Sequence, residues 1–143
     1  MTAIHRFVEE CRAGTLARCL GRMPSGWAVL GDPQIRAGYC LLYPDPVVGH
    51  LNELDAEARA KFWADLGRLG DAILAETGAD RVNYEILGNQ EPALHAHAIP
   101  RWVDEPEVVR TKPIWLDDWA IAKPYDPESD RMLQESLQRR LGL

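Results

Sequence analysis

Two histidines separated by a single residue are the side chains in this sequence best placed to do chemistry. They are His95 and His97, in the segment Leu94-His-Ala-His-Ala-Ile99, which alternates as a β-strand does. Side chains on a strand point alternately to its two faces, so both imidazoles project from one face with Cβ atoms roughly 6–7 Å apart. Neutral imidazole is a nucleophile and a metal ligand, and its cation stabilises phosphate charge. The pair therefore points to phosphate or metal chemistry.

On the residues alone, three interpretations of this pair stay open. The first is a structural pair without chemistry. The second is a metal site, which needs a third ligand, with His50 and Glu85 as candidates. The third is a phosphate-handling pair in which one imidazole attacks phosphorus. The sequence contains no P-loop, no Rossmann glycine pattern and no cysteine metal motif.

Hydrophobic spacing predicts the elements that must position the histidines. It predicts helices over 3–12, 55–76 and 126–141, and strands over 27–30, 38–43, 81–87 and 94–99. Thr15 to Leu20 favours a short helical turn, and the stretch from Trp102 to about Pro124 is predicted to be irregular. Ala96 and Ala98 project away from the histidines and are small enough to lie under a closely packed helix.

This order of elements predicts one α+β domain over 1–143, with a mostly antiparallel sheet. Its core spans about 1–105, and a C-terminal extension spans about 106–143.

Composition narrows the class of protein. The chain has 143 residues, of which 46% are hydrophobic and 27% charged, as in an ordinary globular domain. Its net charge of −6 argues against nucleic-acid and acidic-membrane partners, which select for excess Lys and Arg. No apolar run approaches the roughly 20 residues of a membrane helix. The N-terminus has no signal-peptide pattern, and the odd number of cysteines, three, gives no disulfide framework. We therefore expect a cytoplasmic protein.

The segment from Ala93 to Arg101 resembles the signature of the histidine-triad superfamily, in which histidines alternate with apolar residues and Pro-Arg often follows. Similar stretches lie upstream at 83–89, 38–44 and 49–54, so the resemblance covers roughly Trp27 to Arg101. It is strongest to bacterial members described as diadenosine-polyphosphate hydrolases. The resemblance implies an α+β fold with an antiparallel sheet of about five strands, a long helix across one face, and a homodimer.

The family's register assigns the triad positions. In that family the proline follows the last triad histidine by three residues, so Pro100 makes His97 the last histidine and His95 the middle one. Ala93 then occupies the first position, where the family has a supporting histidine. The family also often has histidine where this chain has Tyr39. The two departures suggest one altered support network, in which substitutions at 39 and 93 should couple non-additively.

The resemblance also implies a mechanism. The middle histidine, His95, attacks the α-phosphorus of a nucleotide to give a nucleotidyl-His95 intermediate, and His97 donates a hydrogen bond to the phosphate. Gly88, Asn89 and Gln90 contact phosphate, and Asp32 grips the ribose hydroxyls, unless it is simply a turn residue before Pro33. No cofactor is required, although a divalent metal can accompany a polyphosphate substrate.

Two further functions stay open beside phosphoanhydride or phosphoramidate hydrolysis. One is a non-catalytic purine-nucleotide-binding module, and the other is a metal-dependent hydrolase that uses His95 and His97. Transfer of the nucleotidyl group to another acceptor is a variant of the leading function.

Several other side chains are candidates for the site, each with a structural alternative. His50 and Asn52 could lie near a phosphate tail, Asn83 and Glu85 could back the histidines, and Arg101 could contact phosphate or form an ion pair. The tryptophans Trp102, Trp115 and Trp119 could stack on a base, line a dimer surface or pack in the core.

Overall fold

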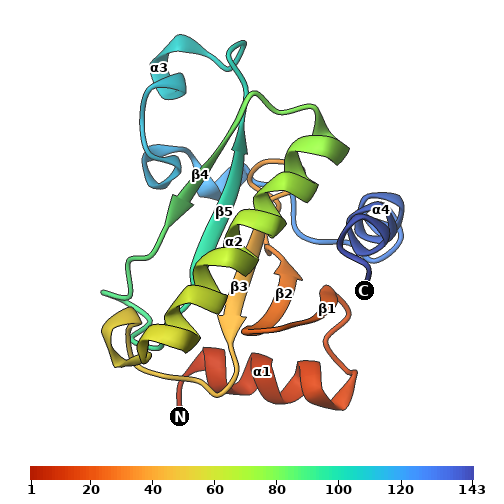
Figure 1. The fold of residues 1–143 in the computed structure, drawn as a ribbon. Coiled ribbons are helices and arrows are strands. Elements are labelled where there is room, and N and C mark those ends of the chain that lie inside the picture. Colours follow the sequence, from red (N-terminus) through yellow and green to blue (C-terminus); the bar gives the residue numbers. More distant parts are fainter.

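The computed structural model describes residues 1–143 as a five-stranded antiparallel sheet with helices on both faces (Figure 1). The strands are β1 (Cys19–Met23), β2 (Gly26–Leu30), β3 (Cys40–Pro44), β4 (Arg81–Glu85) and β5 (Ala96–Arg101). Their order across the sheet is β1-β2-β3-β5-β4. The predicted α+β class and five-stranded antiparallel sheet are therefore confirmed, and β5, which carries His97, lies between β3 and β4.

One face of the sheet is covered by the long helix α2 (Ala56–Thr77), which crosses it diagonally (Figure 1). Asp55 caps its N-terminus by accepting a hydrogen bond from the Ala58 N–H, and Gly78 ends it in the left-handed conformation. The predicted bounds of 55–76 were thus nearly correct. Ala96 and Ala98 are fully buried beneath this helix, as expected from their size and their face of the strand.

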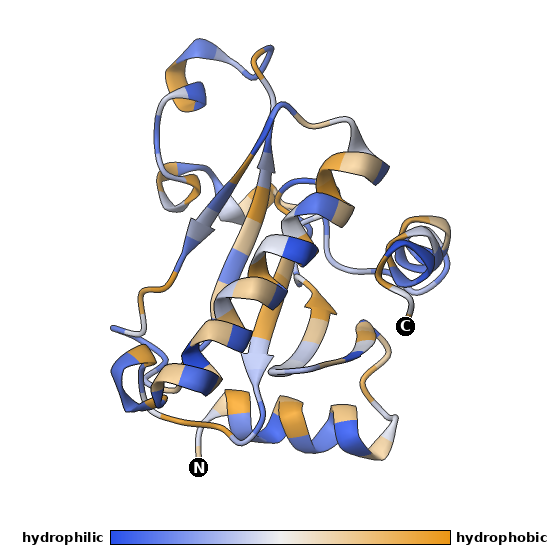
Figure 2. Ribbon diagram, viewed as in Figure 1, coloured by the Kyte–Doolittle hydropathy of each residue, from blue (hydrophilic) through white to orange (hydrophobic).

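The C-terminal helix α4 (Arg131–Leu141) packs beside α2 and against β1. Leu137 and Leu141 join the same core as α2, and the rest of the helix is largely polar (Figure 2). The helix starts five residues later than predicted. Asp126 explains the delay, because its carboxylate accepts hydrogen bonds from the N–H groups of Glu128 and Ser129 and holds a turn there.

The opposite face, the histidine face, is covered by α1 (Ala3–Ala13) and by part of the C-terminal extension. Alternating bands of apolar and polar residues along α1 are visible in Figure 2. Ile4, Val8 and Cys11 form its buried stripe, and Thr2 caps it as predicted. These residues pack against Val29, Tyr39, Leu41, Tyr43 and Ile99 of the sheet.

The predicted helical turn over Thr15–Leu20 is limited to a single turn in which the Cys19 N–H donates to the Leu16 carbonyl, and a strand follows that was not predicted. Residues 19–23 form β1, whose residues Cys-Leu-Gly-Arg-Met carry little strand signal. The strand forms because it pairs with β2 in a hairpin and because α4, more than 100 residues later in the chain, packs on it.

The extension is more regular than predicted. It contains the short helix α3 (Glu107–Arg110) and two 3₁₀ turns, η2 (Ile114–Leu116) and η3 (Trp119–Ile121). A third 3₁₀ turn, η1 (Leu51–Glu53), leads into α2. None of the helices is long and apolar enough to cross a membrane.

Candidate active site

The two histidines of the pair lie side by side on the histidine face. His97 is in β5, opposite Leu41 of β3 and Glu85 of β4, and His95 immediately precedes that strand. Their ring centroids are 4.9 Å apart with planes at 72°. Each residue is less than a tenth exposed, so the pair forms a partly desolvated unit.

The protonation of His95 is set by the backbone. Its Nδ1 lies 2.7 Å from the carbonyl oxygen of Ala93. A carbonyl can only accept, so Nδ1 carries the hydrogen and donates it. In the neutral ring the lone pair is then on Nε2, so that atom is the one able to act as a nucleophile or a metal ligand.

The environment of His97 keeps its ring neutral. Burial, reinforced by the neighbouring His95, lowers the pKa of His97 to about 3. Its Nδ1 lies 2.7 Å from the hydroxyl of Tyr39. The two imidazoles thus sit in different settings, one held by a backbone carbonyl and the other by a phenol.

Two tryptophans from the extension form a wall beside this pair. The ring of Trp115 meets His97 edge-on, with centroids 4.8 Å apart and planes at 78°. It stacks nearly parallel on Trp119 at 5.0 Å, and its indole N–H donates to the Glu85 carboxylate. Sequence patterns left these tryptophans as candidates only, because no periodicity connects positions 115 and 119 to the histidine strand.

The loop between β4 and β5 contains Gly88, Asn89 and Gln90. Gly88 has φ of +72°, a left-handed conformation that glycine adopts without strain. The side chains of Asn89 and Gln90 are exposed and make no hydrogen bond within the protein. These amides are therefore free to contact a ligand, on the loop that leads into His95.

Asp32 lies just beyond the end of β2 and is exposed. One of its carboxylate oxygens, Oδ1, accepts a hydrogen bond of 2.9 Å from the backbone N–H of Tyr125. It therefore helps to anchor the chain that leads to α4, while Oδ2 has no partner in the protein.

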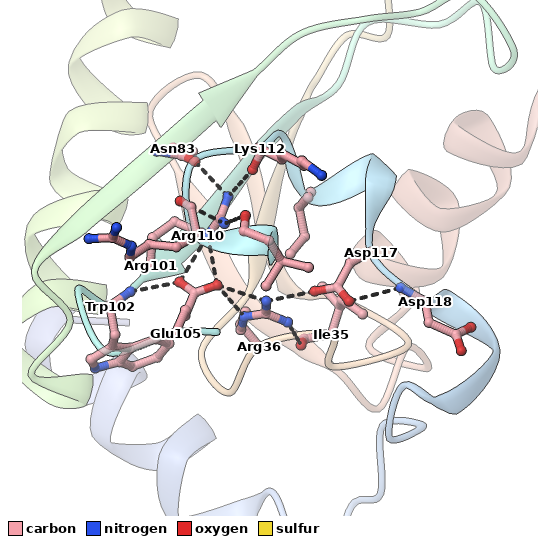
Figure 3. A network of polar contacts seen from close by, with 12 residues as sticks. Ile35, Arg36, Asn83, Arg101, Trp102, Glu105, Arg110, Lys112, Asp117 and Asp118 are labelled. Atoms are coloured by element: carbon pink, nitrogen blue, oxygen red, sulfur yellow. Dashed lines mark hydrogen bonds and ion pairs between the residues drawn. The ribbon is translucent and has the colours of Figure 1, made fainter. Parts of the chain in front are cut away.

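Arg101 has a structural environment (Figure 3). Its guanidinium is buried and donates to the Glu105 carboxylate at 3.0 Å and to Oδ1 of Asn83 at 3.1 Å. It also donates to the backbone carbonyls of Val109, Arg110 and Lys112. The donors of Arg101 are therefore engaged within the protein. Of the two predicted roles, contact with phosphate or an ion pair, the structure shows the ion pair, which holds the extension on the sheet.

Glu105 joins Arg101 to a second arginine. Arg36 donates to Glu105 at 2.7 Å and to Asp117 at 2.6 Å, which extends the network across the extension (Figure 3). Burial alone would raise the pKa of the Glu105 carboxyl. The hydrogen bonds from Arg101, Trp102 and Arg36 outweigh burial and lower this pKa below its ordinary value.

His50 and Asn52 make no hydrogen bond to the two histidines. His50 is exposed and pairs with Glu53 at 3.3 Å, and Asn52 is exposed in η1. No group of three or more His, Cys, Asp or Glu side chains is arranged to hold a metal ion. Neither predicted third ligand, His50 or Glu85, completes such a group with the two histidines.

Comparison with solved structures decides the fold. A histidine triad protein from Marinobacter aquaeolei VT8 matches with a TM-score of 0.76 at 22% identity, covering 99% of this chain and 97% of that one. A hypothetical histidine triad nucleotide-binding protein from Sulfolobus tokodaii strain 7 matches at 0.73 and 18% identity, covering 96% and 91%. The chain has the histidine-triad fold.

A third protein with the histidine-triad fold, described as a Zn-bound family protein from Mycobacterium smegmatis, matches at 0.69 and 17% identity, covering 96% and 92%. No protein-family model matches the chain, and no curated protein does. The histidine-triad fold is therefore assigned by shape. It confirms, at the level of fold, the resemblance predicted from the segment 93–101.

Proposed function

We propose that the protein is a nucleotidyl hydrolase or transferase of the histidine-triad type, which cleaves a nucleoside phosphoanhydride such as a dinucleoside polyphosphate through a nucleotidyl-His95 intermediate. The observation that carries the proposal is the hydrogen bond from His95 Nδ1 to the Ala93 carbonyl. This bond leaves the lone pair on Nε2 of a ring that is buried beside a second imidazole.

In the first step, Nε2 of His95 attacks the α-phosphorus of the bound nucleotide. The N–P bond forms as the bond to the leaving-group oxygen breaks, and the leaving group departs with the electron pair. His95 becomes an N-phosphorylated imidazolium. Its Nδ1–H keeps its hydrogen bond to the Ala93 carbonyl, which stabilises the positive charge.

In the second step, water attacks the same phosphorus. The N–P bond breaks, neutral His95 is restored, one proton is released and a nucleoside monophosphate leaves. An acceptor hydroxyl or phosphate in place of water gives transfer instead. Positioning and charge stabilisation dominate both steps. We assign this work to His97 and to the free amides of Asn89 and Gln90, with Gly88 allowing close approach and Asp32 Oδ2 receiving the ribose.

The state of His97 favours an anhydride over a phosphoramidate. An amine leaving group needs a proton, whereas a phosphate or polyphosphate leaves as a stable anion. Because the pKa of His97 is lowered to about 3, this ring offers a hydrogen bond at neutral pH but no readily transferred proton.

A basic groove beside the site also supports an anionic leaving group. The groove, of about 710 Å³, runs along β4 from Glu85, the residue opposite His97. Arg81, Arg110 and Lys112 line it without forming an ion pair, and the carboxylates of Asp80 and Glu85 line it as well. The three cations outnumber the two carboxylates, so the groove can attract the anionic end of a polyphosphate.

The test is release of nucleoside monophosphate from a panel of adenosine phosphoanhydrides and phosphoramidates, with and without chelator. We expect chelator-insensitive release for the wild type, since we propose no required cofactor and a divalent cation only as a companion of the polyphosphate. His95→Ala should lower the rate by on the order of 1,000-fold or more. His5→Ala, which removes the histidine that contacts the Thr2 hydroxyl at the start of α1, is the matched control and should keep full activity.

Other outcomes separate the alternatives. Trapping of a nucleotide on His95, seen by intact mass after acid-free quenching, supports the covalent route directly. Retained AMP binding without release from any substrate or to any acceptor would instead identify a nucleotide-binding module. Activity that disappears with chelator and returns with zinc would replace the covalent mechanism by a metal-dependent one.

A further inference from the structure

Tyr39, the residue just before β3, is buried against the histidine pair. It is 4% exposed, and its ring lies beside His97 with centroids 6.0 Å apart and planes at 22°. Trp119 meets it edge-on at 6.2 Å. The hydroxyl is 2.7 Å from His97 Nδ1 and has no other side-chain partner.

Gly31, the residue just after β2, makes room for this ring. A Cβ atom at Gly31 would overlap the Tyr39 ring, so only glycine at 31 lets the ring lie flat against the end of β2. The glycine at 31 thus lets the Tyr39 ring pack closely against the backbone there. The hydroxyl is therefore held in a fixed place relative to His97.

The direction of the hydrogen bond follows from the available donors and acceptors. Burial raises the pKa of the Tyr39 phenol, so the hydroxyl keeps its proton at neutral pH. Buried O–H groups nearly always donate a hydrogen bond, and the acceptor that the structure places within reach of this one is Nδ1 of His97. Nδ1 then carries the lone pair, and the hydrogen of the neutral ring is on Nε2.

We infer that Tyr39 is a positioning residue that fixes His97 as its Nε2–H tautomer, so that the ring presents an N–H donor to a phosphate bound beside His95. The tautomer itself is a property of the free protein, whereas its use on a phosphate rests on the proposed function. His95 and His97 are thus held in opposite tautomers, one with a lone pair on Nε2 and the other with a hydrogen there.

Ala93 cannot orient His97 in place of Tyr39. It is buried in the same cluster as Tyr39, and its methyl group offers no polar atom to either imidazole. The Tyr39 hydroxyl is therefore the sole polar side-chain contact of His97 Nδ1. Without it, either nitrogen of the neutral ring could carry the hydrogen, and the Nδ1–H form would aim a lone pair at the phosphate oxygens.

The test compares Tyr39→Phe, which removes only the hydroxyl, with Tyr43→Phe. Tyr43 is buried on the same face of β3, but its hydroxyl faces Arg18 instead of the histidines. The first measurement is the ¹⁵N spectrum of the histidine rings in the free protein at pH 7. We expect wild type and Tyr43→Phe to show His97 with a protonated Nε2 and an unprotonated Nδ1, and Tyr39→Phe to show both tautomers.

The second measurement is steady-state kinetics on the best anhydride substrate. Tyr39→Phe should lower kcat in proportion to the Nε2–H fraction that it loses, by about two- to ten-fold, with a much smaller change in KM. Tyr43→Phe should leave kcat within about two-fold of the wild type.

The outcomes separate the two proposals. A wild-type His97 with its hydrogen on Nδ1, or an unchanged Nε2–H tautomer in Tyr39→Phe, would overturn the role of Tyr39 whatever the kinetics show. The expected tautomers in a protein that cleaves no nucleotide would uphold Tyr39 and overturn the proposed function. The wild-type spectrum alone decides the first point if a variant fails to fold.

Discussion

The two neighbouring imidazoles differ because of what lies at each Nδ1. A backbone carbonyl faces His95 and a phenol faces His97, so two residues of one type receive different hydrogen positions. Alternation along a strand predicted that both rings share a face, and this is correct. It could not predict the hydrogen positions, because the phenol comes from a residue 58 positions away in the chain.

The depressed pKa of His97 predicts a pH-dependent stability. An unfolded histidine binds a proton below about pH 6.5, whereas folded His97 does so only near pH 3. Between these values the unfolded state holds more protons, so this contribution is complete above pH 6.5 and is lost as pH falls toward 3. We expect His97→Gln to remove on the order of a few kcal/mol of the wild-type pH dependence of unfolding between pH 7 and pH 4.

Urea unfolding at several pH values checks this, with His50→Gln as the control, since His50 is exposed. Parallel curves of unfolding free energy for the wild type and His97→Gln would contradict the burial of His97 as the cause.

At the scale of elements, the sequence predicted well what is local and poorly what depends on distant partners. The helix α2 follows from the spacing of Phe62, Leu66, Leu69 and Ile73, with its stop at Gly78. The strand β1 was not predicted, and the extension was predicted to be irregular. Trp115 reaches the histidines only because the extension is fastened to the sheet, and the fastening groups are too far apart along the chain for a local pattern to connect them.

The ion pairs of Glu105 with Arg101 and Arg36 predict that a single substitution at Glu105 destabilises the fold strongly. Glu105→Gln leaves the buried guanidinium of Arg101 without its carboxylate and weakens the bridge to Arg36. We expect it to destabilise the fold by about 3–5 kcal/mol, since breaking one half of a buried ion pair leaves a charge uncompensated.

Hydrogen–deuterium exchange should then rise over residues 102–117 more than over α2. Glu57→Gln, which breaks an exposed ion pair with Lys61, is the control and should change stability by less than about 0.5 kcal/mol. Equal protection of the extension in Glu105→Gln and wild type would show that other contacts hold it.

At the scale of the whole molecule, charge is unevenly distributed. The chain is acidic overall, yet Arg81, Arg110 and Lys112 gather in one groove. The double variant Arg81→Glu, Lys112→Glu should lower kcat/KM for an adenosine polyphosphate by about ten-fold or more. It should leave kcat/KM nearly unchanged for an AMP ester with an uncharged leaving group.

The matched control for the groove is the charge reversal Arg139→Glu on α4, whose only side-chain hydrogen bond is to Ser136. It should leave the rates on both substrates unchanged. An equal loss on both substrates in the groove variant would mean that the cations act on the shared AMP half or on folding.

The open edge of the sheet supports the proposed homodimer. β4 pairs only with β5, and three large apolar residues are about half exposed near this edge: Trp63, Tyr84 and Leu87. Gly70 of α2 lies directly over the Tyr84 hydroxyl, and Trp63 is seven residues earlier on the same side of the helix. An unpaired strand beside apolar side chains favours association with a second copy.

Sedimentation equilibrium should therefore give the mass of two chains. The double variant Trp63→Lys, Leu87→Lys should shift the protein toward one chain, whereas Ile121→Lys, an exposed apolar residue of the extension, should not. A monomeric wild type at micromolar concentration would refute the dimer.

The close fit of Tyr39 to Gly31 also has an evolutionary consequence. A chain with this fold that carries tyrosine at the position of Tyr39 must carry glycine at the position of Gly31, because any Cβ there would overlap the ring. The two positions should therefore covary, with glycine fixed first as the permissive substitution. An ancestor that acquired the phenol without the glycine would have had to displace the ring, and with it the hydroxyl, from His97.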